Sequence, residues 1–125
     1  MKNILKLEEA AMFGFCVCIL IFLKEPWWVF LLLLIGPDIS MLGYLAGNKT
    51  GAFCYNLFHH KGIAILLFII GYQLTDPLDH NLIILGIILL GHSSLDRMLG
   101  YGLKYQQGFK YTHLGIIGKG KSETE

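Results

Sequence analysis

Residues 81–105 read NLIILGIILLGHSSLDRMLGYGLKY, and this stretch decides the fold. Its first half is almost wholly apolar, whereas His92, Asp96 and Arg97 follow in its second half. A helix that crosses a membrane needs about 20 mostly apolar residues. Ionisable side chains inside such a helix are costly and mark a functional site by default. The stretch therefore predicts a membrane-spanning helix that carries a polar site.

The composition of the whole chain points to the same class of protein. Of its 125 residues, 54% are hydrophobic and 15% are charged, and the mean hydropathy is +0.57. Soluble domains are about 45–50% apolar and about 25% charged. The formal net charge of +1 argues against a nucleic-acid partner, and three cysteines are too few for a disulfide framework. The chain is predicted to be a small integral membrane protein.

Three further apolar stretches precede residues 81–105, and each approaches the length of a span. They cover residues 10–23, 27–46 and 51–74. Gly36 and Pro37 interrupt the second stretch, and because proline removes a backbone donor we expect a kink there. The sequence thus predicts an all-α fold, a four-helix transmembrane bundle. One domain is expected over residues 1–118 and a disordered tail over residues 119–125.

The orientation of the predicted bundle follows from its lysines and arginines. Lys2 and Lys6 precede the first span, Lys49 lies in the second connection, and several lysines follow the last span. The connections on the other side hold only Lys24 as a positive charge. Because Lys and Arg accumulate in cytoplasmic loops, we expect both termini in the cytoplasm and a location in the inner (plasma) membrane.

The ionisable residues of the last three spans fall at similar predicted depths. A helix rises about 1.5 Å per residue, which brings all of them into the cytoplasmic half of the membrane. They are Asp38, His59, His60, His92 and Asp96. His92 and Asp96 are four residues apart and share one helical face. We therefore expect a single shared cluster.

The donor set of this cluster is typical of a divalent metal site. Carboxylates and neutral imidazoles without a thiolate suit zinc, manganese or iron. The spacing leaves open which of His59 and His60 points inward. The predicted metal ligands are Asp38, His60, His92 and Asp96, with zinc as the first choice of ion. His59 or His113 would act as acid and base, and Arg97 would hold an anionic group.

Four runs of the sequence form a distinctive set. They are GPDISMLGY (36–44), YNLFHHKG (55–62), GHSSLDRMLGYGLKY (91–105) and FKYTHLG (109–115). Together they resemble the pattern of a bacterial family of small integral membrane proteins of unknown function, over residues 7–119. This resemblance implies a membrane fold and names no activity.

A looser similarity connects three shorter motifs to membrane-bound metal-dependent hydrolases of the inner membrane. The matching positions are Pro37-Asp38, His60-Lys61 and His92-x-x-x-Asp96. Those hydrolases are larger and usually carry arginine at the position of Lys61.

The leading functional hypothesis is an intramembrane metal-dependent enzyme, hydrolase-like, that acts on a lipid or lipid-linked substrate near the cytoplasmic leaflet. In a second hypothesis the cluster relays protons or ions in a transport module, since Asp and His chains in membranes commonly do so. In a third, the chain is a structural subunit whose polar residues only pair helices. The expected partner is membrane lipid, a homo-oligomer is an open alternative, and no nucleic acid is expected.

Overall fold

The computed structural model describes residues 1–74 and 78–118 and is mostly helical. The predicted disordered tail, residues 119–125, lies outside the described residues. The elements are α1 (Lys2–Phe22), α2 (Trp27–Ile35), the 3-10 helix η1 (Gly36–Ala46), α3 (Asn48–His59), α4 (Lys61–Gln73), α5 (Leu78–Met98), β1 (Tyr111–Thr112) and β2 (Gly115–Ile116). The predicted helical character is confirmed, although the two short antiparallel strands near the C-terminus were not predicted.

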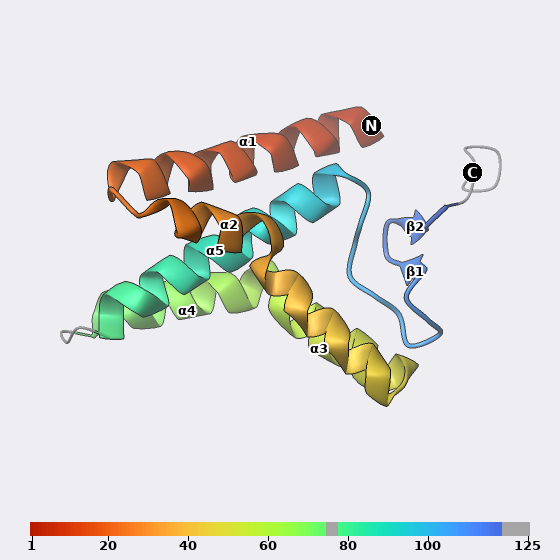
Figure 1. Cartoon of the computed structure of the whole chain (residues 1–125). Helices are drawn as coiled ribbons and strands as arrows, with labels where there is room; N and C mark the ends of the chain where they lie inside the picture. The colour runs from red at the N-terminus through yellow and green to blue at the C-terminus, as the bar shows by residue number, and fades with distance from the viewer. Residues whose placement is uncertain (75–77, 119–125) are drawn as a thin grey trace.

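Helix α5 is the central element, and α1, α2 and α4 pack along it (Figure 1). The apolar core joins α1, α2 and α5 through buried side chains that include Leu20, Leu33 and Ile87. Gly86 allows the closest approach of α4, because a Cβ atom there would lie 2.7 Å from the carbonyl oxygen of Ala64. This apolar packing lies within the first two-thirds of α5 and ends where the polar residues begin.

The helix that starts at Trp27 changes type at Gly36, where a kink was expected. Ile35 leaves helical geometry with φ −134° and ψ −15°, and the chain then continues as η1. Pro37 occupies the first turn of η1 and has no N–H to donate to the carbonyl of Leu33. The predicted interruption of the second span is therefore confirmed. A 3-10 run of this length is unusual, because such runs rarely exceed about four residues.

The third predicted span, residues 51–74, is not one straight helix. It consists of α3 and α4, which meet at an angle of 49°. His60 lies between them in an extended conformation, and its ring Nδ1 accepts a hydrogen bond from the N–H of Gly62 at 3.0 Å. This contact caps the start of α4 and separates the two helices. Helix α3 packs against η1 and extends away from the other helices (Figure 1).

The last predicted span is shorter than expected, because α5 ends at Met98 rather than near Tyr105. Gly100 adopts φ +96°. The N–H of Tyr101 donates to the carbonyl of Asp96 at 2.8 Å, and the N–H of Gly100 donates to the carbonyl of Arg97. This pair of bonds is a Schellman motif, which terminates helices at a glycine. The chain then returns toward α3, where the Asn56 side chain bonds to both the N–H and the C=O of Lys104.

Within residues 1–74 and 78–118, two helical stretches are long and apolar enough to cross a membrane. They are Trp27–Ala46, which comprises α2 and η1, and His80–Met98 of α5. The bent pair α3 and α4 would be a third if it forms one span. Helix α1 carries Lys6, Glu8 and Glu9 and does not meet the same measure. The structure is thus compatible with a membrane protein.

Candidate metal centre

Four ionisable side chains from three elements converge on one point. Asp38 comes from the start of η1, His59 from the end of α3, and His92 and Asp96 from the last two turns of α5. One ligand atom from each lies within 4.8 Å of all the others. The depth comparison thus correctly anticipates that Asp38, His92 and Asp96 meet. The structure places His59 with them and leaves His60 outside.

The break at Pro37 explains how His92 is oriented. In an uninterrupted helix the carbonyl of Leu33 would accept the N–H of residue 37, which proline lacks. His92 Nδ1 takes that place and lies 2.9 Å from the Leu33 oxygen. A carbonyl oxygen only accepts hydrogen bonds, so Nδ1 must carry the proton. In the neutral ring Nε2 is then a bare lone pair, directed toward the centre of the cluster.

His59 is oriented in the same way by the second helix break. Its Nδ1 lies 2.8 Å from the carbonyl oxygen of Tyr55, so this nitrogen is also the protonated one. Because α3 stops at His59, the carbonyl of His59 is free, and the hydroxyl of Ser93 donates to it at 2.6 Å. Metal-bound histidines usually donate their other N–H to a carbonyl or carboxylate in this manner.

In neutral rings the two Nε2 atoms are acceptors, and they face carboxylate oxygens, which are also acceptors. His92 Nε2 lies 3.1 Å from Asp38 and 3.5 Å from Asp96. His59 Nε2 lies 3.2 Å from Asp96 and 3.6 Å from Asp38, and it has no hydrogen-bond partner within the described residues. Acceptors that point at one another need a proton or a cation between them. The residues present therefore fit a metal ion, since each offers a lone pair to the same space.

Burial is uneven across the four side chains. Those of His92 and His59 are 1% and 3% exposed and that of Asp96 is 13% exposed, whereas that of Asp38 is 41% exposed. The cluster is thus closed on the side of α5 and open on the side of Asp38. Of the four side chains, that of Asp38 is the most accessible to solvent.

Tyr55 belongs to the site although no role was predicted for it. Its ring stacks on His59 with centroids 3.8 Å apart and planes 7° from parallel. Its hydroxyl donates to Asp96 at 2.6 Å. The residue spacing held the signal, because Tyr55 and His59 are four residues apart on one helical face. Tyr55 therefore fixes the position of one imidazole and one carboxylate together.

The other residues with predicted site roles lie outside the cluster. His60 is exposed and caps α4, and His59 is the member of this pair that lies in the cluster. His113 lies near the C-terminal strands, where its Nδ1 accepts the N–H of Leu103 at 2.8 Å. Burial, and after it the charge of Arg97, lowers the pKa of His113. Arg97 is half-buried and has no ion-pair partner among residues 1–74 and 78–118.

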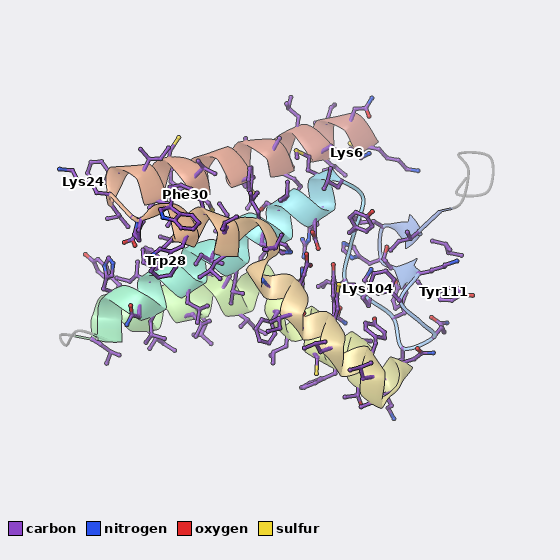
Figure 2. The ribbon with its side chains drawn as sticks, in the orientation of Figure 1. Lys6, Lys24, Trp28, Phe30, Lys104 and Tyr111 are labelled. Carbon is purple, nitrogen blue, oxygen red and sulfur yellow. The ribbon has the colours of Figure 1, made fainter. Side chains whose placement is uncertain are left out.

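Lys104 is the unexpected neighbour of this site. It is 3% exposed, and its ammonium lies 3.9 Å from the ring centroid of Phe109 and 4.7 Å from that of Tyr55. Figure 2 marks Lys104 in the C-terminal segment beside α3. Its Nζ has no hydrogen-bond partner in the described part of the chain, so cation–π contacts stabilise its charge. Burial lowers the pKa of Lys104 to about 8.

Comparison with known proteins identifies a family and no activity. No curated protein matches the chain, and no solved structure does. A family described as a domain of unknown function (DUF4260) matches residues 2–117, which is nearly the whole chain. The predicted membership of a family of unknown function is therefore confirmed, and the chain belongs to the DUF4260 family.

Proposed function

We propose that this chain binds one divalent metal ion in the cluster of Asp38, His59, His92 and Asp96 and uses it to hydrolyse a lipid or lipid-linked substrate. His59, His92 and Asp96 are the proposed ligands, and Asp38 faces the open side of the ion. The convergence of two bare imidazole nitrogens and two carboxylates carries this proposal. Two carboxylates and two neutral imidazoles have a net charge of −2, which a divalent cation neutralises. Nitrogen and oxygen donors at short mutual distance suit zinc first, and iron or manganese next.

The uneven burial suggests how roles are divided among the four residues. Catalytic zinc sites commonly use three protein ligands and keep one position open. His59, His92 and Asp96 are the buried members and form a two-histidine, one-carboxylate set. Asp38 is the member with access to water, and is placed to accept a proton. The bound ion would supply the nucleophile, because it lowers the pKa of a bound water to about 7.

The membrane setting supports a lipid-linked substrate. We place the chain in the inner (plasma) membrane with four spans, formed by α1, by α2 with η1, by α3 with α4, and by α5, and with both termini in the cytoplasm. Asp38 and η1 lie next to exposed apolar side chains, among them Ile39 and Leu42. A substrate that diffuses in the bilayer would meet the open side of the site directly.

Two adjacent histidines allow a matched test of metal binding. The metal content of the purified full chain is measured for wild type, His59→Ala and His60→Ala. We expect about one metal per wild-type chain, the same for His60→Ala, and very little for His59→Ala. Equal metal content in the two variants, or none in wild type, would refute the metal site.

A second experiment tests the hydrolase part of the proposal. The wild-type chain and Asp38→Asn are reconstituted in vesicles of bacterial lipid extract, and lipid products are followed by mass spectrometry. We expect metal-dependent release of a hydrolysis product from wild type only, while Asp38→Asn still retains metal. A wild-type chain that holds metal and releases no product would leave a binding site without this activity.

The position of the cluster also favours a transport or relay function as the alternative. It lies between two broken helices, at the α2–η1 and α3–α4 junctions, and transporters often bind ions at such interruptions. Ion flux into proteoliposomes that persists after chelation and stops in Asp96→Asn would support this alternative. A purely structural role predicts a loss of thermal stability in Asp96→Asn and no other change.

A further inference from the structure

The face of α5 opposite the metal centre has its own pattern. Ile87, Leu90 and Arg97 recur at spacings of three and seven residues, so they lie along one side of the helix. His92 and Asp96 occupy the other side, toward η1 and α3. The cationic end of the first face is therefore separated from the metal centre by the width of the helix.

An apolar groove of about 160 Å³ runs along this first face. Its floor is α5 and its walls are α1 and α4, which lie on two sides of α5 (Figure 1). Every lining residue is apolar or glycine, among them Phe15, Ile65 and Leu90. Apolar cavities of similar volume, about 150 Å³, stay dry and bind small apolar molecules. The groove thus suits one hydrocarbon chain segment.

Charged residues close one end of this groove. Lys61 forms an ion pair with Glu9 across α1 and α4, and its Nζ lies 3.5 Å from the sulfur of Met12. Met12 and Lys61 each precede a groove residue, Cys16 and Ile65, by one helical turn. The charged end of the groove is therefore continuous with its apolar walls, as in a site for an amphipathic molecule.

The charges at this end are positive in sum. Lys61 and Arg97 are cations, Glu9 is the one anion that the structure pairs there, and Arg97 has no ion-pair partner within residues 1–74 and 78–118. Arg97 lies seven residues beyond Leu90 on the same face of α5 and in the last turn of that helix. A guanidinium with free donors is well matched to a phosphate group.

We infer that an anionic membrane phospholipid binds here, with an acyl chain in the α1–α4 groove and its phosphate at Arg97 and Lys61. This lipid lies on the side of α5 away from the metal centre. It is therefore a bound partner of the fold and not the substrate of that centre, and the inference stands without the proposed function.

Lipid retention by the full chain tests this inference. The protein is purified from nanodiscs of phosphatidylcholine, alone or mixed with phosphatidylglycerol, and bound lipid is counted by native mass spectrometry. We expect phosphatidylglycerol to be retained preferentially. Each basic residue near a membrane surface contributes about 1 kcal/mol of attraction, so Arg97→Gln should lower that preference about fivefold. Lys110→Gln, which removes an exposed lysine elsewhere, should leave the preference unchanged.

A second pair of variants tests the groove itself. Ile65→Trp fills the groove and should lower retention of the lipid, whereas Leu66→Trp changes the neighbouring exposed residue outside it and should not. Metal content should be unchanged in Ile65→Trp, which separates this inference from the metal site. Equal retention of both lipids would overturn the inference. So would loss of the bound phosphatidylglycerol on addition of inorganic phosphate alone, because the site would then recognise a free phosphate and not a lipid.

Discussion

The two parts of this molecule are held together by different forces. Around the first two-thirds of α5, buried side chains such as Leu20 and Leu33 pack against one another, and the helices satisfy their own backbone hydrogen bonds. At the junction of η1, α3 and α5, two helices are interrupted and carbonyl groups become free. Side chains then bind those carbonyls. The difference shows that a helix break can orient ionisable side chains as well as end a helix.

At each helix break of the junction, one histidine ring bonds to a backbone carbonyl. The Leu33 carbonyl that Pro37 leaves without a donor receives His92, and the last turn of α3 receives His59. In the apolar part, replacing one side chain with a smaller one causes a moderate loss of packing energy. At the junction, the loss of one partner leaves a buried polar group unpaired, which costs about 1–3 kcal/mol for each neutral group.

The largest expected effect is at His92. His92→Ala removes a ligand and the donor to the Leu33 carbonyl, so bound metal should fall to a small fraction of the wild-type content, as measured by elemental analysis. His80→Ala is the matched control on the same helix, because His80 pairs with Glu25 at the other end of α5. Wild-type metal content in His92→Ala would contradict the polar junction as a metal site.

The next effect should come from Pro37. Pro37→Ala restores an N–H that competes with His92 for the Leu33 carbonyl. Changes in such supporting contacts cost about 10–100-fold in metal affinity, which a competition titration with a chelator can measure. Pro26→Ala, at the start of α2, should change the affinity little. If both substitutions act alike, the break at Pro37 does not orient His92.

A smaller effect is expected in the apolar part. Leu20 is fully buried, and Leu20→Ala should lower the free energy of unfolding by about 2 kcal/mol. This is the lower end of the usual range, because lipid tails solvate leucine as well as the core does. Denaturation in mild detergent measures the change. Metal affinity should stay at the wild-type value, and a parallel loss would show that the two parts are coupled.

The smallest effect concerns pH. Burial lowers the pKa of Lys104 to about 8 from 10.5, so the unfolded chain binds more protons than the folded chain between these values. Stability should therefore rise with pH across that window, because stability increases wherever the unfolded state holds more protons. Lys104→Met should lose this dependence. Thermal unfolding followed at several pH values would show whether the slope persists in the variant.

The sequence was a good guide to position along the helices and a poor guide to direction around them. Depth alone brought Asp38, His92 and Asp96 together, because the rise per residue of a helix is nearly constant. The choice between His59 and His60 depends on rotation, and adjacent residues differ by about 100°. The bend at His60 accompanies a local contact, in which the His60 ring accepts a hydrogen bond from the N–H of Gly62. No periodic pattern in the sequence predicts this contact.

The end of α5 could have been predicted from its residues. Gly100 follows a regular helical pattern with arginine in the last turn, which is a common stop signal. The apolar and aromatic residues beyond it suggested a longer span instead. Lys104 could not have been placed, because its contact with Tyr55 depends on how the C-terminal segment returns to α3.

The order of the four clustered residues along the chain has a consequence for biogenesis. Asp38 and His59 emerge from the ribosome well before His92 and Asp96, and His92 is held only once its ring reaches the Leu33 carbonyl. A nascent chain that lacks α5 thus exposes an uncapped carbonyl and half of a binding site. If the cluster binds a metal ion as proposed, the ion can bind with all four side chains only after α5 has been synthesised and has packed against η1 and α3.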